Sequence, residues 1–206
     1  MVPKSVQEAI PIHRLWPDGI FQFGTKYSKT IRFSDINYAI ASKEDKTSMF
    51  LGYSELLNAL DTGSTTKITI NNKRLNRQNF EETILLPPRG DFLDGYRAEY
   101  NAMLTDKVTD SSNSVVQERY ITVSTHKKNV DEARTFFDRV IGDVTSRLNK
   151  LDSHSEELDA IERLRILHDF YRVGEETEFH FNLKDSMRKG ASYKDAICPD
   201  LSLIHI

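Results

Sequence analysis

The sequence predicts an α+β fold in which an antiparallel sheet carries its helices on one face. Two observations lead to this prediction. A strand–helix–strand order occurs twice, over residues 27–72 and 116–159, and each helix shows an apolar stripe that follows a polar capping residue. The strands alternate apolar and polar residues, which suits a sheet that is covered on one face only.

The N-terminal part of the chain predicts an arm followed by a hairpin. Residues 1–18 contain three prolines and no sustained period, so we expect an extended arm that Trp16 anchors. Residues 19–33 alternate in the manner of two strands, and residues 24–26 (Gly-Thr-Lys) supply the turn between them.

The first long helix is expected to begin after Ser42, with Asp45 in the position of a capping-box partner. Gly63 lies beyond its end, where a helix often stops, and residues 65–72 predict the next strand. The expected buried stripe consists of Met49, Phe50, Tyr53, Leu56, Leu57 and Leu60.

The second unit repeats this order. Residues 116–125 predict a strand, Asn129 and Glu132 mark the start of the clearest amphipathic helix, and residues 155–159 predict a short strand. The expected stripe of that helix is Val130, Ala133, Phe137, Val140, Ile141, Val144, Leu148 and Leu151. A last major helix is expected from Asp159, with Glu162 as its capping partner and an apolar side formed by Ile161, Leu164, Leu167 and Phe170.

Two such units form a split βαβ, or ferredoxin-like, arrangement when their strands interleave and right-handed crossovers place both helices on one face. We therefore predict an α+β domain over residues 19–160 after the arm of residues 1–18. Residues 73–114 are predicted to be a helical insertion with helices near 80–85 and 92–108, and residues 161–206 a helical extension.

Composition excludes several classes of protein. The 206 residues include 28 basic and 31 acidic side chains, and the net charge of −3 argues against a surface that binds nucleic acid throughout. Cys198 is the only cysteine, which excludes an internal disulfide and a cysteine-rich zinc site. The sequence lacks the pattern of a signal peptide and a long apolar run, so we expect a soluble, cytoplasmic chain.

One glycine pattern has the outline of a phosphate-binding loop. It runs from Gly19 to Gly24, but Thr25 separates the second glycine from Lys26, and Tyr27 stands where a hydroxyl residue would bind magnesium. The residues between the glycines are bulky and strand-like. We therefore expect a hairpin there, and no catalytic residue elsewhere in this chain.

Two further groups of residues have the composition of functional sites. Glu176, Glu178 and His180 would share one face of a strand, but the alternating Phe179 and Phe181 explain the pattern as an ordinary half-buried strand rather than a metal site. His168 is expected to be a structural histidine, because no nucleophile is recognisable near it.

A basic run is the remaining candidate site. Lys67, Lys73, Arg74 and Arg77 fall within eleven residues that contain no acid, and three asparagines accompany them. The segment has no aromatic residue on which bases could stack. A solvated strand end is the first interpretation, and contact with a partner protein or with nucleic acid are the alternatives.

Specific strings show a family resemblance. They are residues 2–11 (VPKSVQEAIP), 27–30 (YSKT), 66–72 (TKITINN), 157–160 (ELDA), 162–166 (ERLRI), 168–172 (HDFYR) and 197–200 (ICPD). Together they resemble the N-terminal region of the TrbE/CagE-type conjugative-transfer ATPases, in the form carried by conjugative elements of Gram-positive bacteria, over about residues 1–200.

The resemblance implies a function for the whole family protein. It implies a homo-oligomeric ATPase, cytoplasmic and peripheral to the inner face of the cell membrane, that energises a type IV secretion channel. Its N-terminal domain would dock onto inner-membrane components of that channel, and a C-terminal domain would bind ATP and Mg²⁺. We expect this chain to be a non-catalytic docking domain that ends before the ATPase domain, with no cofactor of its own. A freestanding nucleic-acid-binding or adaptor module that uses residues 67–77 is the alternative.

Overall fold

The computed structural model describes residues 3–36, 38–60, 62–74, 84–109, 115–190 and 192–198. The chain divides into two compact units. Unit 1 comprises Met1–Thr69 and Tyr120–Ile206, and unit 2 comprises Ile70–Arg119. The boundaries between them fall within two long strands, β4 (Ser64–Arg74) and β5 (Val115–His126).

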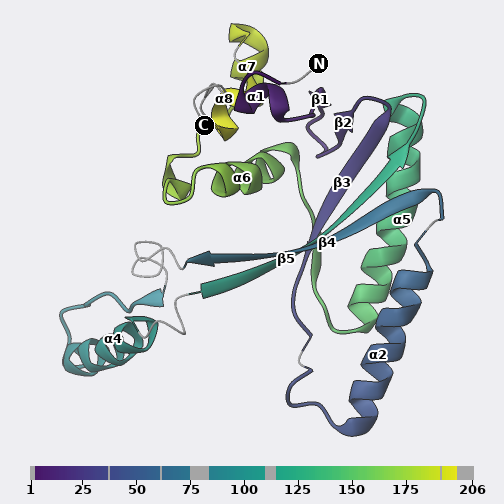
Figure 1. Ribbon diagram of the computed structural model, residues 1–206. Coiled ribbons are helices and arrows are strands. Elements are labelled where there is room, and N and C mark those ends of the chain that lie inside the picture. Colours follow the sequence, from purple (N-terminus) through teal and green to yellow (C-terminus); the bar gives the residue numbers. More distant parts are fainter. Residues whose placement is uncertain are drawn as a thin grey trace. The chain divides into compact units, whose positions relative to one another are not determined.

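Unit 1 contains an antiparallel sheet with helices, so the predicted α+β class is confirmed. Figure 1 shows its described strands and helices. Besides β4 and β5, they are α1 (Val6–Ala9), β1 (Arg14–Leu15), β2 (Phe21–Phe23), β3 (Lys26–Phe33), α2 (Lys43–Asn58), α5 (Val130–Lys150), β6 (Ser155–Glu157), α6 (Ala160–Tyr171), the 3-10 turn η1 (Glu176–Glu178), α7 (Leu183–Lys189) and α8 (Tyr193–Ile197).

The strand order interleaves the two strand–helix–strand units. The order is β1-β2-β3-β5-β4, and β6 also pairs with β3. β5, the first strand of the second unit, therefore lies between β3 and β4, the two strands of the first unit. The ferredoxin-like assignment, which is finer than the α+β class, stays a prediction.

The predicted hairpin is confirmed. Phe21 pairs with Ser28 and Phe23 with Lys26, which leaves Gly24 and Thr25 as a two-residue turn. Gly24 has a φ of 62°, the left-handed conformation that such turns require and that glycine adopts without strain. Gly24 thus shapes the turn of a hairpin.

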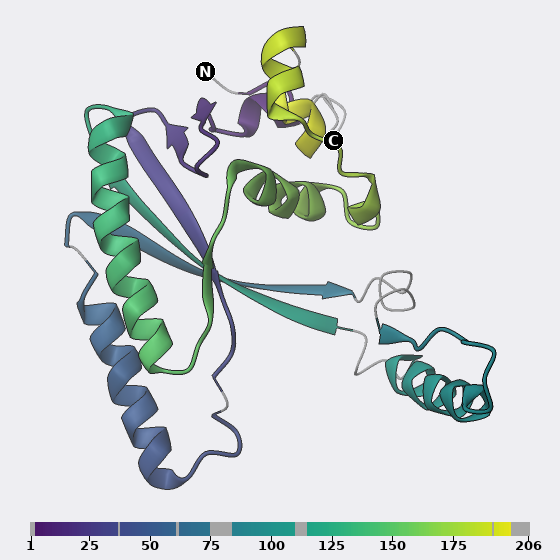
Figure 2. The same cartoon turned by 180° about the vertical axis from the view of Figure 1, so that it is seen from behind.

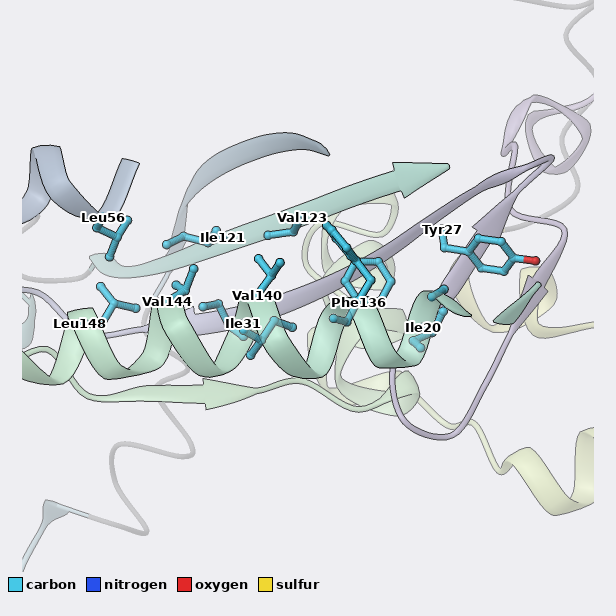
Figure 3. Packing of buried hydrophobic residues seen from close by; sticks show 13 residues of the cluster. Ile20, Tyr27, Ile31, Leu56, Ile121, Val123, Phe136, Val140, Val144 and Leu148 are labelled. Atoms are coloured by element: carbon cyan, nitrogen blue, oxygen red, sulfur yellow. The ribbon is translucent and has the colours of Figure 1, made fainter. Parts of the chain in front are cut away.

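The main core lies between the sheet and two helices. α2 and α5 lie side by side on the same face of the sheet (Figure 1 and Figure 2). Val140 and Val144 of α5 point towards Val123 and Ile121 of β5 (Figure 3). All four side chains are buried, so this helix turns its apolar stripe inwards as the sequence predicts.

The capping predictions are also confirmed. The side chains of Ser42 and Asn129 accept hydrogen bonds from the third residue of their helices, and Asp159 forms a full capping box with Glu162. Parts of the predicted stripes were wrong, because Phe50 and Leu57 of α2 and Phe170 of α6 are exposed. Each lies on a side of its helix that is adjacent to the side in contact with the core.

A second core joins the N-terminal arm to the last helices. The arm is not simply extended, since it forms α1 and β1, and its residues Ile10 and Ile12 are buried. The buried members of this cluster are Ile10, Ile12, Phe21, Ala160, Leu164, Phe179, Ile197 and Cys198. Contacts between residues far apart in sequence thus build this core.

One buried cation connects α6 to the hairpin. Arg163 donates from Nη1 to the carbonyl oxygens of Gly19 (2.6 Å) and Ser28 (2.8 Å) and from Nη2 to Ser28 Oγ (3.0 Å). Its guanidinium lies 4.0 Å from the centre of the Phe21 ring. Burial lowers the pKa of Arg163 to about 9, which leaves the group charged at neutral pH. The apolar pattern of residues 159–171 does not predict a cation on the buried side of this helix.

Unit 2 consists of the ends of β4 and β5 together with α4 (Asp94–Thr109) and the loop before it. The helix near residues 92–108 is confirmed. The helix predicted near residues 80–85 lies largely outside the described residues. No helix in the described part of the chain has both the length and the apolar character needed to cross a bilayer.

Candidate docking surface

The inner side of α4 is polar and is fixed by hydrogen bonds to the loop that precedes it. Asn101 donates from Nδ2 to the carbonyl oxygen of Leu86 and accepts from the Leu86 N–H, both at 2.9 Å. Asp94, in the first turn, accepts from the N–H groups of Arg89 (3.0 Å) and Gly90 (2.7 Å). These paired contacts hold the residue 86–94 segment against the helix.

An ion-pair network completes this inner side. Arg97 donates from Nη1 to Asp91 Oδ1 (2.6 Å) and from Nη2 to Asp91 Oδ2 (2.9 Å), which is a bidentate pair, and it also binds Asp94. The hydrogen bond from Arg97 holds the pKa of Asp91 below its usual value. The pKa of Asp94 is lowered as well, first by the Arg89 N–H and then by Arg97. The polar groups on the inner side of the helix are therefore engaged within unit 2.

The outer side of α4 is apolar and open to solvent. Phe92 is 88% exposed, Tyr96 70%, Tyr100 47% and Met103 46%, and Leu93 is exposed as well. From Leu93 to Met103 the apolar residues follow each other at intervals of three, four and three residues, the spacing of a helix that packs against another helix. Nothing in the described part of unit 2 covers this stripe, so the helix faces solvent with the side that usually faces a core.

Two carboxylates border the apolar stripe. Glu99 lies three residues after Tyr96 and four before Met103, and Asp106 lies three residues after Met103. Residues at these intervals are neighbours on a helix surface. Both side chains are exposed. The stripe and its acidic border form the surface that we call the α4 face, defined by Leu93, Tyr96, Glu99, Tyr100, Met103 and Asp106.

Of the four predicted basic residues, the structure describes the side chains of Lys67 and Lys73, which both belong to β4. Lys67 is exposed in unit 1, whereas Lys73 belongs to unit 2 and forms an ion pair with Glu118 at 2.8 Å. The side chain of Arg74 and the whole of Arg77 lie outside the described residues. An ion-paired lysine is less available to a phosphate, so the described half of this run gives little support to a nucleic-acid site.

The interpretation of the acidic cluster as a strand was wrong. Residues Glu176–Glu178 form the 3-10 turn η1, and Phe179 after it is buried against the ring of His168 at a centroid distance of 5.3 Å. Phe179 is thus buried, as the half-buried pattern predicted, but it follows a turn and does not lie on a strand. Within the described residues no group of three or more His, Cys, Asp or Glu side chains converges in the way a metal ion requires.

His168 is buried on α6, in agreement with a structural role. Its Nδ1 makes no hydrogen bond and lies 3.5 Å from Asp169 Oδ1. An open hollow of about 640 Å³ lies nearby, and its lining includes Arg165, His180 and Asp195. Among the residues that the structure describes, no nucleophile lies beside His168 in a recognised catalytic arrangement, so the described geometry assigns it no chemistry.

The chain matches no model of a known protein family, and no curated protein matches it significantly. The α4 face therefore rests on geometry alone. The helix was predicted from sequence but its faces were not. The three–four–three spacing from Leu93 to Met103 was the available signal, and it does not say whether the stripe lies inside or outside.

Proposed function

We propose that this chain is a non-catalytic docking and assembly domain of a conjugative-transfer ATPase, and that the α4 face is its contact surface. In this proposal the ATPase is peripheral to the inner face of the cell membrane and its contacts are inner-membrane components of the secretion channel. ATP and Mg²⁺ would bind in a separate C-terminal domain.

One observation carries the proposal, the outward orientation of the apolar side of α4. Burying aromatic and methionine side chains contributes much of the affinity of protein interfaces, and Tyr is enriched among the residues that dominate binding. A helix whose polar side is satisfied internally and whose apolar side is open is suited to a partner. The strings that resemble the transfer ATPases supply the class of partner.

The test is capture of the channel's inner-membrane proteins by the full chain. We expect the wild-type chain to retain them from detergent-solubilised membranes in which they are co-expressed. The double substitution Tyr96→Ser/Tyr100→Ser removes the centre of the α4 face and should abolish capture.

A matched control separates this surface from exposed aromatic residues in general. Phe170 and Tyr171 on α6 are also exposed, and the Phe170→Ser/Tyr171→Ser variant should capture as the wild type does. Equal losses in both variants, or no capture by the wild-type chain, would contradict the proposal.

A further inference from the structure

We propose that the partner on the α4 face is a single helix of another protein, which has apolar residues at heptad spacing and a flanking row of Lys or Arg. This inference rests on the proposed function and specifies the chemistry of its partner.

The spacing of the stripe favours a helix as the occupant. Apolar residues at intervals of three and four form a straight seam along an α-helix, and a second helix with the same repeat fits its knobs into that seam. α4 has 16 residues, so its axis is about 24 Å long at 1.5 Å per residue. The seam from Leu93 to Met103 covers most of that length.

The charge beside the seam sets the chemistry of the partner. Glu99 and Asp106 are one heptad apart and exposed next to the apolar residues. On the opposite border stands Arg97, which is already bound to Asp91 and Asp94. Lys107, which follows Met103 by four residues, adds one exposed cation at the end of the seam. The border formed by Glu99 and Asp106 is acidic, and charge complementarity calls for basic residues on the partner opposite these two acids.

A second copy of this chain fits less well. Two α4 helices in antiparallel contact would bring Glu99 and Asp106 of one copy against the same acids of the other. In parallel contact, a flanking residue faces the position five residues further along the other copy, so Glu99 would face Leu104 and gain no ion pair. Like charges at flanking positions disfavour a pairing.

A membrane surface also fits less well. Helices that lie on membranes carry Lys and Arg along their polar border, because the lipid surface is anionic. The α4 face carries two carboxylates in that position, which an anionic bilayer repels. The charge pattern thus favours a basic helix of a protein over both alternatives.

The experiment measures the binding of two synthetic helical peptides to the full chain by fluorescence anisotropy. Both peptides have the same leucine seam over about three heptads, and one carries Lys while the other carries Glu at the flanking positions. The wild-type chain should bind the Lys peptide about fivefold more tightly, because two exposed ion pairs change affinity by roughly this factor. The Tyr96→Ser/Tyr100→Ser variant should bind it about 30-fold more weakly than the wild type.

Charge-reversal variants separate a local effect from net charge. Glu99→Lys/Asp106→Lys should reverse the preference, so that the Glu peptide binds more tightly. Asp138→Lys/Asp143→Lys changes two exposed acids of α5 by the same net charge and should retain the preference for Lys. Equal binding of both peptides by the wild type, or the same change in both variants, would overturn the inference.

Two further measurements decide against the alternative occupants. Sedimentation of the chain with phosphatidylserine vesicles, or self-association, would overturn the inference if the Tyr96→Ser/Tyr100→Ser substitutions abolished it. Failure with the peptides together with α4-dependent capture of channel proteins would refute only the helical, basic partner. Loss of that capture would refute the proposed function.

Discussion

The helices α4 and α5 carry similar sequence patterns and use them in opposite ways. Both place apolar residues at intervals of three and four. In α5 these residues are buried in the core, while in α4 they are exposed and the polar side packs against its own chain. The pattern predicts an amphipathic helix, but the sequence does not specify which molecule covers the apolar side.

The difference follows from what holds each helix in place. α5 contacts the sheet through apolar side chains, so the hydrophobic effect fixes its orientation. α4 is fixed by Asn101, Asp94 and Arg97, whose partners lie in the preceding loop. The described contacts that fix α4 therefore do not involve its apolar stripe, which stays exposed.

The largest expected effect comes from truncating one aromatic residue in each helix. Phe137 of α5 is fully buried, and Phe137→Ala should lower the free energy of unfolding by about 3–5 kcal/mol. Tyr96→Ala should change it by less than about 0.5 kcal/mol, as is usual for exposed sites. Urea denaturation followed by circular dichroism measures both, and similar losses would break the comparison.

The next effect contrasts two arginines. Arg163→Ala leaves two carbonyl groups and a hydroxyl without their donor in a buried region, and should cost about 2–4 kcal/mol of unfolding free energy. Its neighbour Arg165→Ala, at an exposed position, should cost less than about 0.5 kcal/mol. Thermal denaturation of the pair tests this, and an Arg163→Ala variant as stable as wild type would show that these hydrogen bonds contribute little.

Sequence reasoning succeeded where the signal is local. The caps at Ser42, Asn129 and Asp159 and the turn at Gly24 depend on neighbouring residues, and all four were predicted. The second core was not predicted, because Ile10 and Cys198 meet only in the fold. The burial of Arg163 was not predicted for the same reason, since its acceptors lie more than 130 residues away in the sequence.

The candidate site was predicted only in part. The helix of residues 94–109 follows from its periodicity, but its orientation depends on where Asn101 and Arg97 find partners, and those lie in an irregular loop. The basic run, by contrast, stood out in the sequence because charges are easy to count. Lys73 shows why counting is insufficient, since Glu118 on the neighbouring strand pairs with it.

A smaller effect concerns the response of unit 2 to acid. The pKa values of Asp91 and Asp94 are lowered by folding, so their contribution to stability is present above the unfolded value near 3.8 and is lost as the pH falls through the lower folded values. Hydrogen exchange at Arg89 and Gly90 should show reduced protection below that pH, relative to free-peptide rates. The Asp94→Asn variant should lose much of this pH dependence, whereas α5 amides serve as an unaffected reference.

The smallest expected effect is on nucleic acid. If Lys67, Lys73, Arg74 and Arg77 each met one phosphate, the logarithm of the affinity would fall with the logarithm of salt concentration with a slope of about −3 to −4. We expect no such binding to single- or double-stranded DNA, and no change on Lys67→Ala. A slope in that range would restore the nucleic-acid alternative.

Thiol labelling tests the central claim, the opposite orientation of the two apolar stripes, most directly. Cys198 is the only natural cysteine and is buried, so the wild-type chain provides a low background. A cysteine introduced by Tyr100→Cys on α4 should react with a maleimide under native conditions nearly as fast as in urea. One introduced by Val140→Cys on α5 should be protected at least about 100-fold, because it reacts only when the core opens. Equal protection at both positions would contradict the account, since it would mean that the α4 stripe is covered within the chain.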